Sequence, residues 1–152
     1  MIFRAVLQIC LLGLLILASV IDIKKRIIPN YIDILVLLIG FLLIPTFENP
    51  LNRFLSGLLG FLAAVILCVV VRVLFKDGMG MGDIKLIIAL GFTLTINGFI
   101  EMLFLTSIIS LIGALFMILK KHADRRAKMP FAPYLAVGTG VSIIFDYVLE
   151  FL

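Results

Sequence analysis

Two stretches share one arrangement: Asp22-Ile23-Lys24-Lys25-Arg26-Ile27-Ile28-Pro29-Asn30 and Gly80-Met81-Gly82-Asp83-Ile84-Lys85. Each places one aspartate where a long apolar run meets a charged loop. A carboxylate at the edge of a membrane is costly unless it is paired, hydrated or used chemically. Two such aspartates on one side of a membrane would suit a pair that shares a proton.

The composition indicates that lipid is the solvent for much of this chain. Of its 152 residues, 64% are hydrophobic, and the mean hydropathy is +1.32, whereas soluble domains are closer to half apolar. The net charge of +4 does not indicate nucleic acid, because the basic residues lie in short loops and no nucleic-acid motif is present. We predict an all-α polytopic membrane protein, one transmembrane domain over residues 1–152, with the lipid bilayer as a partner.

Six hydrophobic segments are expected to form about six transmembrane helices. The second and the fourth are shorter than the ~20 residues that a span needs. We therefore expect them to borrow flanking residues, to tilt little, or to cross where the protein thins the bilayer. The six segments are 2–21, 31–45, 51–75, 84–96, 99–119 and 131–152.

The basic residues predict an orientation. Eleven of the 13 Lys and Arg residues fall in the loops 22–30, 72–85 and 120–130, and Arg4 and Arg53 lie opposite them. The positive-inside rule places these loops in the cytoplasm and both termini outside, which agrees with an even number of spans. We predict a multi-pass protein of the cytoplasmic (inner) membrane. No removable signal peptide is expected, because the first apolar run is too long and no basic cluster precedes it.

The sequence contains no recognisable metal site. Cys10 and Cys68 lie inside apolar runs without a CxxC pair, and His122 is the only histidine. We expect buried free thiols, with a disulfide as the less favoured alternative. No metal and no cofactor are expected.

Asp22 and Asp83 are the candidate catalytic residues. Asp22 ends the first apolar segment and Asp83 opens the fourth, so both are expected near the cytoplasmic edge of the membrane. If they meet laterally, like charge and partial desolvation should keep one proton on the pair. One carboxylate would then activate a water, and the protonated one would polarise a peptide carbonyl and protonate the leaving amine.

A simpler interpretation of each aspartate is structural. Asp83 precedes an apolar run and suits a helix N-cap, where the helix dipole also favours it. Asp33 is expected in the first turn of the second helix, where the dipole stabilises it. The remaining aspartates are expected in loops or at the interface, and they are Asp77, Asp124 and Asp146.

Three motifs lie in order along the chain. Asp22 is followed by basic residues and Ile28-Pro29-Asn30, the stretch 80–86 reads GxGDxKL, and the stretch 129–138 follows a PFGPFLxxG pattern in which Ala132 and Tyr134 depart. In these motifs the chain resembles the type IV prepilin peptidase family, which includes the archaeal preflagellin peptidases. Members of that family are polytopic aspartyl proteases of the GxGD type.

The resemblance implies that Asp22 and Asp83 are the catalytic pair. Lys85 would tune that pair or bind a peptide carbonyl, although a snorkelling interfacial lysine explains it equally well. Pro130 and Pro133 would set the start of the sixth helix. The supporting or substrate-binding residues implied are Lys85, Gly80, Gly82, Pro29 and Asn30.

The resemblance also implies the substrate. It would be a prepilin-like membrane precursor (pilin, pseudopilin or flagellin-type) with a short basic leader, a glycine before the cut and a hydrophobic helix after it. Bifunctional relatives carry a further region with paired CxxC motifs that is associated with N-methylation. This sequence has no such motif, so we expect a peptidase without methyltransferase activity. The alternatives are a small ion- or proton-coupled transporter or channel and a catalytically silent scaffold.

Overall fold

Five α-helices and one short 3₁₀ helix make up the computed structural model, which describes residues 2–75, 79–119 and 130–151. No strand occurs in these ranges, so the predicted all-α class is confirmed. Each long apolar run forms a helix because leucine-rich sequence has a high helix propensity. The elements are α1 (Ile2–Lys25), α2 (Asn30–Leu43), η1 (Ile44–Thr46), α3 (Pro50–Leu74), α4 (Met81–Leu119) and α5 (Ala132–Phe151).

Helix α4 consists of two arms joined at Thr95, whose φ of 64° and ψ of 176° are not helical. We predicted two segments here, over 84–96 and 99–119, and the break lies at the end of the first segment rather than between the two. The carbonyl of Thr93 accepts a hydrogen bond of 2.7 Å from Nη2 of Arg53. Arg53 thus supplies a donor where the helical ladder is interrupted.

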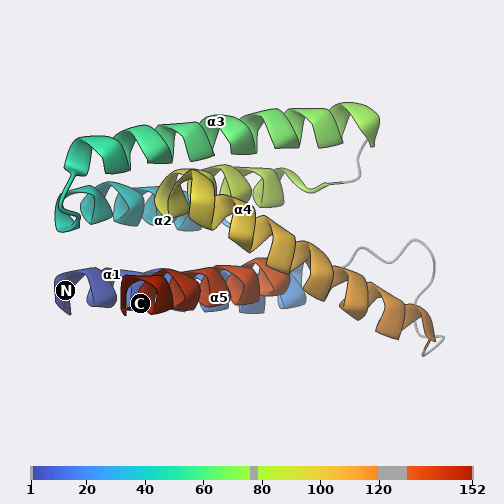
Figure 1. The fold of residues 1–152 in the computed structure, drawn as a ribbon. Coiled ribbons are helices and arrows are strands. Elements are labelled where there is room, and N and C mark those ends of the chain that lie inside the picture. The colour runs from blue at the N-terminus through green and yellow to red at the C-terminus, as the bar shows by residue number, and fades with distance from the viewer. Residues whose placement is uncertain (1, 76–78, 120–129, 152) are drawn as a thin grey trace.

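The helices form two layers that α4 connects. Figure 1 shows α2, α3 and the first arm of α4 in one layer and α1 with α5 in the other, with the second arm of α4 running diagonally between them. Helix α4 packs against α2, α3 and α5, and α1 packs against α2 and α5. Both chain termini lie at the same end of the molecule (Figure 1). Their placement outside the membrane stays a prediction.

Small residues allow α3 and the first arm of α4 to approach closely. The buried residues of α3 are all small: Gly57, Gly60, Ala64 and Cys68. A Cβ on Gly60 would clash with the backbone oxygen of Gly91 in α4. Close backbone contact of this kind drives helix association in lipid, where the hydrophobic effect between helices is absent.

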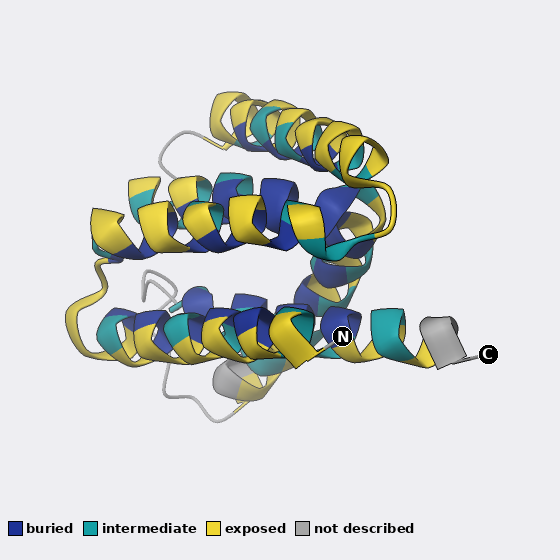
Figure 2. Cartoon of the chain, turned by 90° about the vertical axis from the view of Figure 1, so that its left-hand side faces the viewer, coloured by how far each residue is buried: buried dark blue, intermediate teal, exposed yellow. Residues whose placement is uncertain are grey.

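The outward faces of the helices are apolar. Figure 2 shows exposed residues on the outer faces and buried residues on the faces that meet. Among the described residues, three helices are long and apolar enough to cross a membrane, namely Ile2–Lys25, Pro50–Leu74 and Met81–Phe116, and two shorter apolar helices cover Asn30–Thr46 and Ala132–Val148. Such a surface suits lipid, and the number of six spans stays a prediction.

Both cysteines are free thiols. Cys68 is buried, as we predicted. Cys10 is exposed, so the prediction of a buried thiol was wrong there. Position 10 lies on the outer face of α1 with other exposed apolar residues, and an apolar run does not tell an inward face from an outward one.

Candidate active site

Asp22 and Asp83 line one small pocket. It has a volume of about 250 Å³ and lies between the end of α1, the loop before α2 and the start of α4. The two carboxylates are close enough for the charge of Asp22 to act on Asp83. The structure therefore brings together two residues that are far apart in the sequence.

Asp22 is held by the start of α5. Asp22 is only 6% exposed, and its Oδ2 accepts a hydrogen bond of 3.2 Å from the backbone N–H of Ala132. Ala132 is the first residue of α5, where backbone N–H groups have no acceptor within the helix. The third motif thus reaches the pocket through its backbone.

This contact of Ala132 was missed by sequence reasoning, which gave the third motif only a structural role through Pro130 and Pro133. A hydrogen bond from a backbone N–H cannot be predicted from the residue type, because every residue except proline has this donor. The available signal was position, because the motif opens an apolar run and the first turn of a helix presents free N–H groups.

Asp83 is the third residue of α4, which begins at Met81. The alternative interpretation of Asp83 as the N-cap is therefore wrong, because Gly80 precedes the helix and accepts its first hydrogen bond, from Ile84. The carboxylate of Asp83 instead accepts a hydrogen bond from the backbone of Gly80, as in a capping box. Its Oδ1 is buried and has no hydrogen-bond partner among the described residues.

The two glycines of the second motif lie in tight contacts. A Cβ on Gly80 would lie 3.1 Å from Oδ2 of Asp83, and a Cβ on Gly82 would lie 3.0 Å from Cβ of Ile28. No described glycine has a positive φ, so neither residue serves an unusual backbone conformation. Gly80 precedes α4, and Gly82 lies in its first turn. Gly82 allows α4 to approach the chain that follows α1.

Lys85 connects the second motif to the first. Its Nζ donates a hydrogen bond of 3.0 Å to Oδ1 of Asn30, the first residue of α2. Pro29 precedes the helix in an extended conformation and makes no side-chain cap. Lys85 is exposed, and its ammonium group is held at the surface by this amide.

Asp33 is a third carboxylate near the pair, which sequence reasoning did not foresee. It lies in the first turn of α2, as expected, but it is 8% exposed. Neither of its oxygens has a hydrogen-bond partner among the described residues, and the charges of Lys85 and Asp83 act on it. The sequence signal that was available is the spacing of three residues between Asn30 and Asp33, because residues three apart lie on the same face of a helix.

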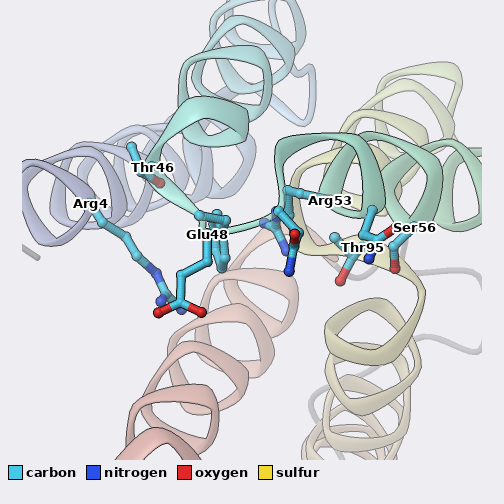
Figure 3. A pocket seen from close by; sticks show the side chains of 9 residues that line it. Arg4, Thr46, Glu48, Arg53, Ser56 and Thr95 are labelled. Carbon is cyan, nitrogen blue, oxygen red and sulfur yellow. The ribbon is translucent and has the colours of Figure 1, made fainter.

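A larger pocket lies at the opposite end of the molecule. It has a volume of about 670 Å³, and Figure 3 shows Arg4, Glu48 and Arg53 among the side chains that line it. The guanidinium groups of Arg4 and Arg53 lie 4.2 and 4.3 Å from the ring centroid of Phe47. None of the predicted site residues lines this pocket.

Within the described residues, no group of three or more His, Cys, Asp or Glu side chains is placed to hold a metal ion. Asp77, Asp124 and His122 lie outside the described residues.

Comparison with known proteins bears directly on this site. The model of the type IV leader peptidase family matches residues 9–118. The chain belongs to this family. The matched range contains the first two motifs and both pocket aspartates, and it ends before the third motif. The family resemblance that we inferred from the motifs is confirmed.

The chain is also similar to three curated proteins named prepilin leader peptidase/N-methyltransferase. The Bacillus subtilis protein is 30% identical over 141 residues, which cover 92% of this chain and 56% of the relative. The Xanthomonas campestris protein is 28% identical, covering 90% and 47%, and the Aeromonas hydrophila protein is 28% identical, covering 86% and 46%. The chain spans about half the length of these relatives. No solved structure matches it.

Proposed function

We propose that this chain is a membrane aspartyl endopeptidase that removes the basic leader of type IV prepilin-like precursors at the cytoplasmic face of the inner membrane. The observation that carries the proposal is the shared pocket of Asp22 and Asp83. Both lie at helix ends next to apolar runs, in a chain of the type IV leader peptidase family.

The two carboxylates divide the chemistry of peptide hydrolysis. One of them, ionised, takes a proton from a water molecule, whose oxygen then forms a bond to the peptide carbon. The other, protonated, donates a hydrogen bond to the carbonyl oxygen and then transfers that same proton to the leaving nitrogen as the C–N bond breaks. The pair begins and ends with one proton, and the backbones at Ala132 and Gly80 orient its two members.

The location of the pocket suits a substrate that is itself anchored in the bilayer. A hydrophobic precursor helix lies beside the enzyme in lipid, and its leader remains at the surface near the end of α1 and the start of α4. The bond to be cut must leave the helical conformation, and a glycine before it eases this unwinding.

Cleavage by the purified chain tests the proposal. The chain is incubated in detergent with a precursor that has a short basic leader, a glycine and a hydrophobic segment, and mass spectrometry identifies the products. We expect one cut after the glycine, unaffected by EDTA because a carboxylate pair performs the reaction. We also expect no methyl transfer from S-adenosylmethionine. Absence of cleavage, or EDTA inhibition that added metal reverses, would contradict the aspartyl mechanism.

The transporter alternative differs in the depth of its expected site. Transport sites lie near the middle of the bilayer, whereas both pocket aspartates lie at helix ends. Ion flux into proteoliposomes that depends on Asp22 would favour the alternative, and we expect none.

A further inference from the structure

A groove between α2 and α4 adjoins the aspartate pair. It has a volume of about 420 Å³, with the polar residues Asn30, Asp33 and Lys85 where the two helices begin. Apolar side chains continue the groove along both helices, and they are Ile34, Leu37, Ile88 and Ala89. Ile34 is 65% exposed, so the groove opens onto the outer surface that we assign to lipid.

Asp33 is the unusual residue of this groove. More than nine-tenths of its surface is buried, yet neither carboxylate oxygen has a hydrogen-bond partner among the described residues. A buried carboxylate without donors is unfavourable, and a partner charge with hydrogen-bond donors relieves this cost. Lys85 acts on Asp33 electrostatically, but its Nζ is hydrogen-bonded to Asn30. The acceptor positions of Asp33 are therefore not filled by the described part of the chain.

The carboxylate of Asp33 favours a cationic ligand in the groove. Asp33 feels the negative charge of Asp83 and the positive charge of Lys85, and Asp22 in turn acts on Asp83. Arg26 lines the adjoining pocket together with Asp22 and Asp83, so its positive charge also lies at this end of the molecule. A lysine or arginine side chain that enters the groove would meet Asp33, a buried carboxylate without a hydrogen-bond partner among the described residues.

We propose that this groove is the subsite that reads the leader, with Asp33 accepting charge-assisted hydrogen bonds from the Lys or Arg side chain nearest the cut. The apolar walls hold the first residues of the hydrophobic segment that follows. The proposal rests on the proposed peptidase function and names a specificity residue for it. It also explains how a basic leader is accepted at an end of the protein rich in basic loops.

Two precursors that differ at one position test the subsite. One carries lysine as the leader residue nearest the cut, and the other carries glutamine there. We expect the wild-type chain to cleave the lysine precursor with a kcat/KM roughly thirtyfold higher, because an unpaired buried charge is costly. Asp33→Asn should lose about that factor on the lysine precursor and stay within about twofold of wild type on the glutamine precursor.

Two control variants accompany the test. Asp33→Glu keeps the charge and should restore part of the preference for lysine, while Glu48→Gln, at the opposite end, should leave the preference unchanged. Equal cleavage of both precursors by the wild-type chain overturns the subsite, and this result needs no variant. Equal slowing of both precursors by Asp33→Asn also overturns it, with the peptidase function intact. Cleavage of neither precursor by the wild type overturns the peptidase function itself, and the subsite with it.

Discussion

The two ends of the molecule hold charged residues in different ways. At the end that carries the N-terminus, the guanidinium groups of Arg4 and Arg53 lie over the ring of Phe47, and Arg53 also donates a hydrogen bond to the carbonyl of Thr93. At the other end, Asp83 keeps one buried oxygen without a hydrogen-bond partner, and Asp33 keeps two, among the residues that the structure describes.

This difference distinguishes charged residues that stabilise the fold from charged residues that are proposed to act in the reaction. The arginine end surrounds the larger pocket, about 670 Å³ against about 250 Å³ around the aspartate pair. Polar groups that are bonded to the protein contribute to its folding, whereas a buried acceptor that the fold leaves open calls for an explanation, of which a functional site is one. Pocket size alone would therefore point to the end opposite the proposed active site.

The sharpest contrast between the ends is expected from removing one carboxylate at each. Asp83→Asn should lower kcat/KM for precursor cleavage by about 10²- to 10⁴-fold, the usual contribution of a general acid or base. Glu48→Gln, in the large pocket, should leave kcat/KM within about twofold of wild type. Comparable losses of kcat/KM in the two variants would contradict the claim that only the aspartate end takes part in the reaction.

The glycine contact at the aspartate end gives the next largest effect. Gly82→Ala places a methyl group 3.0 Å from Cβ of Ile28 and should displace the start of α4, with a loss of about ten- to hundredfold in kcat/KM. Gly13→Ala is the matched control, since nothing lies within 4 Å of its added Cβ. Wild-type activity of Gly82→Ala would show that this approach of α4 is not needed.

The arginine end should respond in stability rather than in catalysis. Arg53→Met leaves the carbonyl of Thr93 without this donor and should lower the free energy of unfolding by about 1–3 kcal/mol. Denaturation in detergent measures this loss, and kcat/KM per folded molecule should stay within about twofold of wild type. A variant with unchanged stability and impaired cleavage would reverse the assignment of the two ends.

The smallest effect is expected where a polar contact at the aspartate end is exposed. Asn30→Ala removes the acceptor of Lys85 and should lower kcat/KM by about two- to tenfold, as for the loss of one ordinary hydrogen bond. Asn52→Ala in the large pocket serves as the control and should have no effect on cleavage. A loss for Asn30→Ala as large as that for Asp83→Asn would indicate that Asn30 takes part in the chemical step.

The sequence predicts the helices well because the length of an apolar run in lipid fixes a helix almost by itself. It does not locate the break at Thr95, since threonine carries no signal for a positive φ. It identifies Asp22 and Asp83 through motifs, but their convergence depends on how α1 and α4 pack. The burial of Asp33 and the N–H of Ala132 depend on the same packing, which periodicity along one helix cannot give.

The central claim is that Asp22 and Asp83 act as one unit on the peptide bond. The most direct test is kcat/KM for precursor cleavage by Asp22→Asn, by Asp83→Asn and by the double variant, with each protein shown to be folded. If the carboxylates act together, each single variant should lose about as much as the double, because residues of one catalytic unit are far from additive. Full activity in either single variant, or losses that simply multiply in the double variant, would contradict the claim.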